Sequence, residues 1–152
     1  DMLIAGLFPV RKSVLMAILA FAIGHGLYLG SLLLNPGDRW DGLAVGIAVV
    51  LALVFWRMWL YRPEGRRTLI LASLPYLMLL LAVTGLALAR LLPVETLSVA
   101  GVLVASGLSL FAVSDLILAS DLLHGRYFRL QHELVWLLYA TGQTLIALST
   151  WA

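Results

Sequence analysis

Cysteine is absent from this chain, and charged residues make up only 12% of its 152 residues. Without cysteine there is no disulfide, no thiolate metal site and no cysteine nucleophile. A soluble domain is typically about 25% charged, so the chain carries roughly half of the usual charge. Apolar residues take its place: 62% of the residues are hydrophobic, and the mean hydropathy is +1.03. This composition indicates a polytopic membrane protein, and the net charge of +2 gives no sign of a nucleic-acid surface.

Turn signals divide the apolar sequence into segments long enough to cross a bilayer. The strongest is the Asn-Pro-Gly-Asp run at 35–38, and Pro93 breaks the chain at a second place. We predict an all-α, polytopic helix bundle that forms a single transmembrane domain over residues 1–152. Five complete spans are expected at 13–34, 41–61, 68–91, 95–120 and 130–151. Asp41 is the expected N-cap of the second span, and Pro75 is expected to bend the third.

The sequence starts within an apolar segment, at Asp1. Residues 1–10 are interpreted as the second half of a helix that ends before Pro9, so the domain is expected to lack N-terminal residues. The apolar run after Arg11 is too long for the core of a signal peptide and has no small-residue cleavage pattern. These two properties favour a spanning helix.

Basic residues are distributed unevenly between the two sets of alternate loops. The loops at 11–12, 57–67 and 121–133 face one side and hold eight Lys and Arg residues, whereas the opposite loops hold only Arg39 and Arg90. Because Lys and Arg accumulate on the cytoplasmic side, the three basic loops are predicted to be cytoplasmic. We expect an integral, multi-pass protein of a bacterial inner membrane, with an organelle membrane as the alternative.

The most informative residue is Asp115, which interrupts the mostly apolar segment from Phe111 to Ala119. No second charge lies beside it in the sequence. A charge at the centre of a bilayer costs about 2.5–3.5 kcal/mol on insertion scales, so an aspartate there is a functional hypothesis by default. Asp115 is therefore the centre of the predicted site.

Polar residues of other spans are predicted to lie at a similar depth. With a helix rise of about 1.5 Å per residue, most of them fall between the cytoplasmic interface and the midplane, and His25 lies deeper. Helical spacing also places Ser73 and Thr84 on the same face of the third span as Tyr76. In the fifth span, one face carries His132, Trp136, Tyr139, Gln143 and Thr150. One cavity is expected to collect Asp1, Tyr76, Asp115, Tyr139 and Gln143.

Packing roles are the alternative for many of these residues. Tyr and Trp near span ends are more often interface anchors, which we expect for Trp56, Trp59 and Tyr61. Small residues such as Gly107 more often permit close helix packing, and a lone His or Gln is about as often a link between helices as a ligand contact. Only Asp115, and Asp1 if it lies within a helix, lack such an explanation.

Five short stretches of the chain form a recognisable series. They are Asp1–Ile4, the Phe-x-x-x-His-x-x-Tyr segment from Phe21 to Tyr28, Tyr76, the Ser-Asp-x-x-Leu-Ala segment from Ser114 to Ala119, and Leu138–Gln143. In order and separation the series resembles the YhhN family of integral membrane proteins, and it covers essentially the whole chain. Two features depart from the family pattern: the Gly expected before Asp1 is outside the sequence, and the usual pair of adjacent tyrosines reads Leu138-Tyr139. The family is expected to have about eight spans.

The resemblance implies a lysoplasmalogenase, an enzyme that hydrolyses the vinyl ether bond of lysoplasmalogens to a fatty aldehyde and a glycerophospho-base. This reaction needs a proton on carbon and a water that attacks the resulting oxocarbenium-like ion, and two carboxyl groups in different environments can divide these tasks. Asp1 and Asp115 are the expected catalytic pair, and either can be the acid. The implied substrate-binding residues are His25, Tyr28, Tyr76, Ser114, Tyr139 and Gln143. No metal or other cofactor is expected.

A non-catalytic lipid-binding or proton-coupled transport protein is the alternative function, with Asp115 as a proton-carrying or gating residue. A transporter often has an inverted repeat and helices broken at the midplane. This chain has no convincing repeat, and only Pro75 lies within a span. We therefore favour the hydrolase, with a lysoplasmalogen and membrane lipids as binding partners and no nucleic acid.

Overall fold

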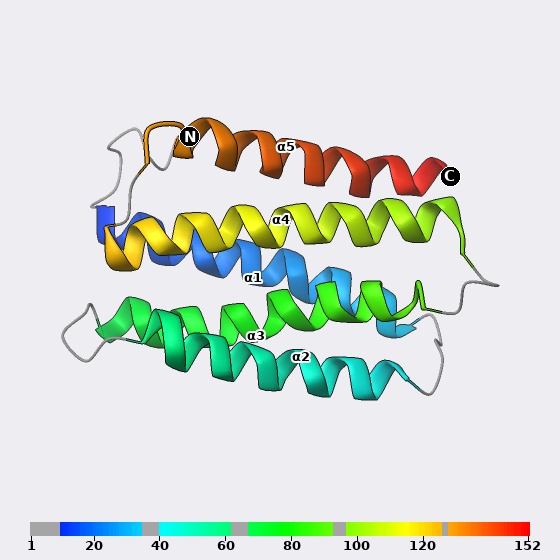
Figure 1. Cartoon of the computed structure of the whole chain (residues 1–152), viewed down its shortest axis with the longest axis horizontal. Coiled ribbons are helices and arrows are strands. Elements are labelled where there is room, and N and C mark those ends of the chain that lie inside the picture. Colours follow the sequence, from blue (N-terminus) through cyan, green and yellow to red (C-terminus); the bar gives the residue numbers. More distant parts are fainter. Residues whose placement is uncertain (1–9, 35–39, 62–66, 93–96, 126–127) are drawn as a thin grey trace.

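The computed structural model describes residues 10–34, 40–61, 67–92, 97–125 and 128–152, and Figure 1 shows the path of the chain. Every regular element in this part of the chain is a helix, which confirms the predicted all-α fold. The elements are α1 (Val10–Leu34), α2 (Asp41–Phe55), η1 (Trp56–Leu60), α3 (Arg67–Ala89), α4 (Val99–His124), α5 (Gln131–Leu148) and η3 (Ser149–Trp151). The π-helical turn η1 continues α2 directly, and the 3-10 turn η3 continues α5.

Four of the described helical segments are long and apolar enough to cross a membrane. They cover Val14–Leu34, Asp41–Leu60, Thr68–Ala89 and Val99–Leu123. α5 is more polar, because its first turn runs from Gln131 to Glu133 and its second half contains Gln143. The fifth predicted span is therefore present as a helix, and its passage through the membrane stays a prediction. Of the predicted half-helix at 1–10, residues 1–9 lie outside the described residues.

The helices lie side by side and alternate in direction (Figure 1). α3 is central, because it packs against α1, α2 and α4, while α5 packs against α4. α1, α3 and α5 start at the end of the bundle where η1 and α4 finish, so the three predicted basic segments lie at one end as expected. The prediction of a loop at 11–12 was wrong, because α1 begins at Val10 and includes both residues. That this end is cytoplasmic stays a prediction. Many side chains of α1, including Met16, Leu19 and Ile23, are exposed apolar groups, as in a helix that borders lipid.

α4 begins and ends four residues later than predicted, because its ends are set by capping groups. Ser98 is the N-cap, and its Oγ accepts a hydrogen bond from the Gly101 amide at 3.0 Å. At the other end Gly125 adopts a φ of 62°, a left-handed conformation that commonly terminates helices. Its amide donates to the Asp121 carbonyl oxygen at 2.7 Å, and the helix extends through Asp121, which the sequence placed in the loop at 121–133.

Two glycines allow α4 and α5 to pack closely. A Cβ atom placed on Gly107 would lie 2.7 Å from the Gly142 carbonyl oxygen and 2.7 Å from Ile146 Cγ1. A Cβ atom placed on Gly142 would lie 2.7 Å from the Gly107 carbonyl oxygen. Small residues at such a contact let helix backbones approach in membrane proteins. The packing role expected for Gly107 is confirmed, and the contact holds α5 against α4.

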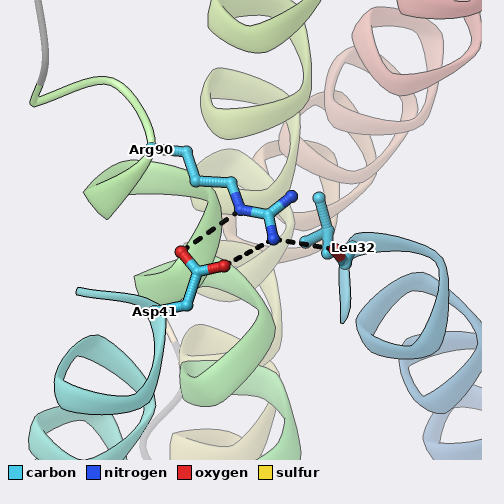
Figure 2. A network of polar contacts seen from close by, with 3 residues as sticks. All are labelled: Leu32, Asp41 and Arg90. Carbon is cyan, nitrogen blue, oxygen red and sulfur yellow. Dashed lines mark hydrogen bonds and ion pairs between the residues drawn. The ribbon is translucent and has the colours of Figure 1, made fainter. Parts of the chain in front are cut away.

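An ion pair joins three helices at the end of the bundle away from η1 (Figure 2). Arg90 Nη2 donates to Asp41 Oδ2 at 2.6 Å and to the Leu32 carbonyl oxygen at 2.7 Å. The prediction that Asp41 caps α2 was wrong. Trp40 occupies the cap position, and the Asp41 carboxylate, in the first turn, pairs with Arg90 instead. The contact ties α1 and α2 to the end of α3.

Three clusters of buried apolar residues fill the interior, and α3 contributes to each of them. One cluster consists of Leu80, Phe111 and Ala112. Tyr76 and Tyr139, two residues of the predicted site, pack against it. This part of the core therefore positions the site.

Candidate active site

Asp115 lies in α4 at the seam with α3, where its carboxylate meets a tyrosine. The hydroxyl of Tyr76, in α3, donates a hydrogen bond to Asp115 Oδ2. Both residues are half-buried. Polar groups removed from water need such a partner, and this one comes from a different helix. The centre of the predicted site is thus a carboxylate held by a phenol.

His25 brings α1 to the same place. It is 2% exposed, and its ring centroid lies 5.8 Å from that of Tyr76 and 4.7 Å from that of Phe111. Its Nδ1 lies 2.8 Å from the Phe21 carbonyl oxygen, one helical turn earlier. A carbonyl oxygen only accepts, so Nδ1 carries the proton and Nε2 of the neutral ring is an acceptor. The buried Nε2 has no hydrogen-bond partner among the described residues, which leaves it for a ligand.

The Phe111 ring contacts the rings of Phe21, His25 and Tyr139. Its buried ring lies 5.7 Å from the Phe21 ring and 5.3 Å from the Tyr139 ring, between centroids. The rings of Phe21 and Tyr139 are themselves 6.1 Å apart, so aromatic contacts join α1, α4 and α5. Such separations are favourable for aromatic pairs. We refer to Phe21, His25, Tyr76, Phe111 and Tyr139 as the aromatic cluster.

Two further predicted residues lie beside this cluster and also serve packing. The Tyr28 ring is 6.3 Å from the His25 ring, and it packs against the buried group around Val83. Ser114 is buried, and its hydroxyl donates to the Val135 carbonyl oxygen at 3.3 Å. Ser114 therefore links α4 to α5, and Tyr28 links the site to the next part of the core.

The structure brings together four of the residues expected to share a cavity or lie near it, namely His25, Tyr76, Asp115 and Tyr139. His25 was expected to lie deeper than the others, and this was wrong, because its ring lies beside the Tyr76 ring. Gln143 is half-buried in α5, one turn after Tyr139. Asp1 lies outside the described residues, so its pairing with Asp115 stays a prediction.

The polar residues predicted on one face of the third span do not face one cavity. Ser73 Oγ accepts a hydrogen bond from Trp56 Nε1 at 3.2 Å and donates to the Ile70 carbonyl oxygen at 2.8 Å. Trp56 Nε1 lies 3.0 Å from the same carbonyl. Trp56 therefore attaches η1 to α3 through its indole, a role beyond the interface anchor expected from the sequence. Tyr76 instead joins the aromatic cluster, and Thr84 is buried.

The sequence interpretation missed Phe21 and Phe111 as parts of the site. Each lies four residues before a residue that was predicted, His25 and Asp115 respectively. Side chains four residues apart lie on the same face of a helix, so this spacing was the available signal.

The arrangement is suited to transferring a proton through a cationic intermediate. A carboxyl group in apolar surroundings can act as a general acid. The faces of aromatic rings attract positive charge, and the free acceptor of His25 can hold a hydroxyl group or a water. A carboxyl group, aromatic rings that can stabilise a cation, and a free hydrogen-bond acceptor therefore lie together between α1, α3, α4 and α5.

The fold and the site define a multi-span helical membrane protein with an acidic residue inside its bundle. The chain belongs to the YhhN family, whose model matches residues 1–150. The resemblance seen in the sequence is thereby confirmed over essentially the whole chain. Comparisons with curated proteins and with solved structures gave no match.

Proposed function

We propose that this protein is an intramembrane hydrolase that cleaves the vinyl ether bond of lysoplasmalogens and releases a fatty aldehyde and a glycerophospho-base. One observation carries the proposal: Tyr76 and Asp115 form a hydrogen-bonded pair beside an aromatic cluster, between helices suited to crossing a membrane. An acid within helices suited to crossing a membrane can meet a substrate whose apolar chain lies in the bilayer. Membership of the YhhN family supports the same reaction, because resemblance to that family implies lysoplasmalogenase activity.

In this mechanism Asp115 is the general acid. Tyr76 occupies Oδ2, which leaves Oδ1 to carry the proton that is transferred. The proton is added to the vinyl carbon farther from the ether oxygen, and the positive charge is then shared by the nearer carbon and that oxygen. The rings of Phe111 and Tyr139 stabilise this charge from the side.

Water completes the reaction. A water molecule adds to the carbon next to the ether oxygen, and its proton returns to the Asp115 carboxylate. In the resulting hemiacetal the bond to the glycerol oxygen breaks as the hydroxyl becomes the aldehyde carbonyl and gives up its proton. The glycerol oxygen takes up one proton in exchange and leaves as the hydroxyl of the glycerophospho-base. The other product is the fatty aldehyde. One water is consumed, and the acid is regenerated.

The remaining residues of the predicted site orient the reactants. His25 Nε2 accepts a hydrogen bond from the water or from a glycerol hydroxyl. Tyr28, Tyr139 and Gln143 contact the polar part of the substrate. Asp1 is the second carboxyl group, which stays ionised and directs the attacking water. Ser114 acts through the link that it forms between α4 and α5.

The test is aldehyde release from a lysoplasmalogen by the purified full-length protein in detergent, with the ester-linked lysophospholipid as the control substrate. We expect turnover of the vinyl ether alone. Asp115→Asn should lower kcat by at least about a hundredfold, the lower end of what a general acid contributes. Lipid binding should persist in this variant.

Asp121→Asn is the matched control, because Asp121 lies in the same helix, is also half-buried and takes no part in the proposed site. It should keep normal turnover. A well-folded wild-type protein that binds the lipid without releasing aldehyde contradicts the hydrolase and favours the lipid-binding or transport alternative. Equal turnover by Asp115→Asn and the wild type would exclude Asp115 as the acid.

A further inference from the structure

Gln131 is the first residue of α5, and its side chain is 1% exposed. Its Oε1 accepts a hydrogen bond from the Phe128 amide at 3.3 Å. Its Nε2 is buried and has no hydrogen-bond partner among the residues that the structure describes. Because Oε1 and Nε2 are bonded to one carbon, the bond to Phe128 also holds Nε2 at the first turn of α5. An amide NH2 group only donates, so Nε2 requires an acceptor from outside this part of the chain.

The surroundings of this donor favour an acceptor with negative charge. A helix start carries partial positive charge, and α5 is 18 residues long. Leu130 occupies the N-cap position, where its apolar side chain makes no capping hydrogen bond. Arg129, which precedes the cap, is exposed and adds a full positive charge. Glu133 in the first turn is exposed as well, so water screens its opposing charge.

The start of α5 lies at the basic end of the bundle, where α1 and α3 also start (Figure 1). The rings of Phe21 and Tyr139 are in contact, and α1 and α5 run in the same direction. The first turn of α1, which includes Arg11 and Lys12, therefore lies at about the level of Gln131. In the three basic segments of this end, eight Lys and Arg residues are accompanied by three acidic residues. Helix dipoles do not stabilise cations at helix starts, so anions from outside the chain are attracted to this end.

The start of α5 is separate from the polar part of the candidate active site. Gln143, which contacts the polar part of the substrate in the proposed mechanism, is twelve residues from Gln131, or about 18 Å along α5. The bond from Ser114 to the Val135 carbonyl oxygen puts the level of Asp115 between these two glutamines. A glycerophospho-base has about eight main-chain bonds and reaches roughly 10 Å at about 1.2 Å per bond. One lipid headgroup therefore cannot lie at both glutamines, and Gln131 requires a second ligand.

The position of this donor determines the kind of ligand. An end of a bundle of membrane-spanning helices lies among lipid headgroups, whose phosphodiester groups are anionic acceptors. Phe128 and Leu130 are 47% and 62% exposed, so the buried Nε2 adjoins side chains that lipid contacts. A phosphate oxygen that displaces one of these side chains reaches Nε2. A choline or ethanolamine headgroup brings its own cation, so the basic end favours a headgroup with a net negative charge.

We propose that the start of α5 binds the phosphodiester group of an anionic phospholipid, with Gln131 Nε2 as the buried donor. One phosphate oxygen accepts from Nε2, and the Arg129 guanidinium balances the charge. This lipid is distinct from the lysoplasmalogen, and the proposal does not rest on the proposed hydrolase. The bound phosphate stabilises the start of α5 and, through it, the packing of α5 against α4.

Lipid binding to the purified full-length protein in a neutral detergent tests the headgroup. The probes are phosphatidylglycerol, phosphatidylcholine and diacylglycerol with the same acyl chains, and native mass spectrometry counts the bound lipid during a titration. We expect the Kd for phosphatidylglycerol to be at least about fivefold lower than that for phosphatidylcholine. Diacylglycerol, which lacks the phosphate, should bind most weakly. Equal Kd values for the three lipids would show that only the acyl chains bind, and would overturn the proposal.

Two substitutions of Gln131 test the donor. Gln131→Met removes it at similar volume, whereas Gln131→Glu keeps an oxygen that accepts from the Phe128 amide and replaces the donor by a negatively charged oxygen. Both should raise the Kd for phosphatidylglycerol at least about tenfold, the effect of losing a hydrogen bond to a charged group. Gln143→Met, the same substitution on the same helix, is the matched control and should keep the wild-type Kd for this lipid.

Two results would overturn the role of Gln131. If Gln131→Met leaves the Kd for phosphatidylglycerol unchanged, or changes it no more than Gln143→Met does, ordered water satisfies Nε2. If only Gln131→Glu raises this Kd, charge repulsion acts without a hydrogen bond. Arg129→Gln should reduce the preference for phosphatidylglycerol over phosphatidylcholine to below about twofold. An unchanged preference would overturn the charge-balancing role of Arg129.

Competition distinguishes the possible sources of the phosphate. Inorganic phosphate should displace phosphatidylglycerol no more than sodium chloride of equal ionic strength does. Stronger displacement would identify a site for free phosphate and overturn the assignment to a lipid. An uncleavable alkyl lysophospholipid should leave phosphatidylglycerol bound, and displacement as effective as that by phosphatidylglycerol itself would place the substrate at the start of α5 and overturn the second-lipid assignment. All of these measurements record binding, so their outcome is independent of whether the protein releases aldehyde.

Discussion

The hydroxyl of Tyr76 and the carboxylate of Asp115 meet across the seam between α3 and α4. The two residues are 39 positions apart in the sequence, and each is carried by a helix long and apolar enough to cross a membrane. The bond therefore has two separable consequences. It contributes to packing between helices, and it orients the acid of the proposed reaction.

A double-mutant cycle with Tyr76→Phe and Asp115→Leu, neither of which keeps the hydrogen bond, should separate these two roles. We expect a coupling free energy of about 0.6 kcal/mol and not more than about 1.7 kcal/mol, the average and the maximum for hydrogen bonds between helices in a membrane protein. It is measured from unfolding of the four proteins in mixed micelles. Tyr76→Phe alone should lower kcat more than it raises KM, because the acid remains but is no longer held. Strictly additive effects on stability and a normal kcat would contradict both roles.

His25→Phe should reduce turnover without loss of stability. The variant keeps an aromatic ring beside Phe111 and removes a buried Nε2 that has no partner in the described part of the chain. Removing an unpartnered polar atom is expected to change the free energy of unfolding by less than about 1 kcal/mol or to increase it. Thermal unfolding and aldehyde release, measured on the same preparation, check this. A clear loss of stability with normal turnover would show that His25 is only a packing residue.

Gly142→Ala should weaken the packing of α5 against α4. The new Cβ atom would lie 2.7 Å from the Gly107 carbonyl oxygen, which is backbone and cannot move aside freely. Overpacking of this kind costs about 1–3 kcal/mol. Tyr139 lies on the same helix, so activity should fall together with the midpoint of thermal unfolding. Gly46→Ala is the control, since nothing lies within 4 Å of its added Cβ and stability should not fall. Similar midpoints for both variants would exclude a tight crossing at Gly142.

Arg90→Met should destabilise the bundle more than the double variant with Asp41→Asn does. The two side chains are 23% and 16% exposed, so removing the cation leaves a carboxylate that is mostly shielded from water. We expect a coupling free energy of about 0.5–3 kcal/mol in the cycle. Denaturant or thermal unfolding of the four proteins measures it. If Asp41→Asn rescues none of the loss, the Leu32 carbonyl is the more important partner of Arg90.

Much of the fold was predictable because membrane spans are encoded by long apolar runs and the turns between them. The runs ending before Asn35 and Pro93 give helices that end near the predicted places. The end of α4 was less predictable, since capping by Ser98 and Gly125 depends on local backbone geometry. Asp41 was predicted to cap α2 because aspartate is common at the start of a helix. In the structure its carboxylate instead pairs with Arg90, 49 positions away in the sequence.

The site was predictable in its residues and not in its geometry. An aspartate in an apolar helix stands out by chemistry alone, and depth arguments grouped it with Tyr76 and Tyr139. Depth does not tell how far each helix is rotated about its axis. That rotation makes Ser73 face Trp56 while Tyr76 meets Asp115, although helical spacing put both on one face. Only packing of the whole bundle determines such a rotation.

The π-helical turn η1 makes the packing of the bundle depend on the length of the chain at this point. The Tyr61 amide donates to the Trp56 carbonyl oxygen, five residues back, so the turn holds one residue more than an α-helical turn. A relative with a one-residue deletion here would form an ordinary turn, and every later residue of this helix would rotate by about 100°. Leu60 would then leave the core, and Trp59 would lose its ring contact with Phe55. Insertions and deletions at 56–60 are therefore expected to loosen the contact of η1 with α3 even where each side chain type is kept.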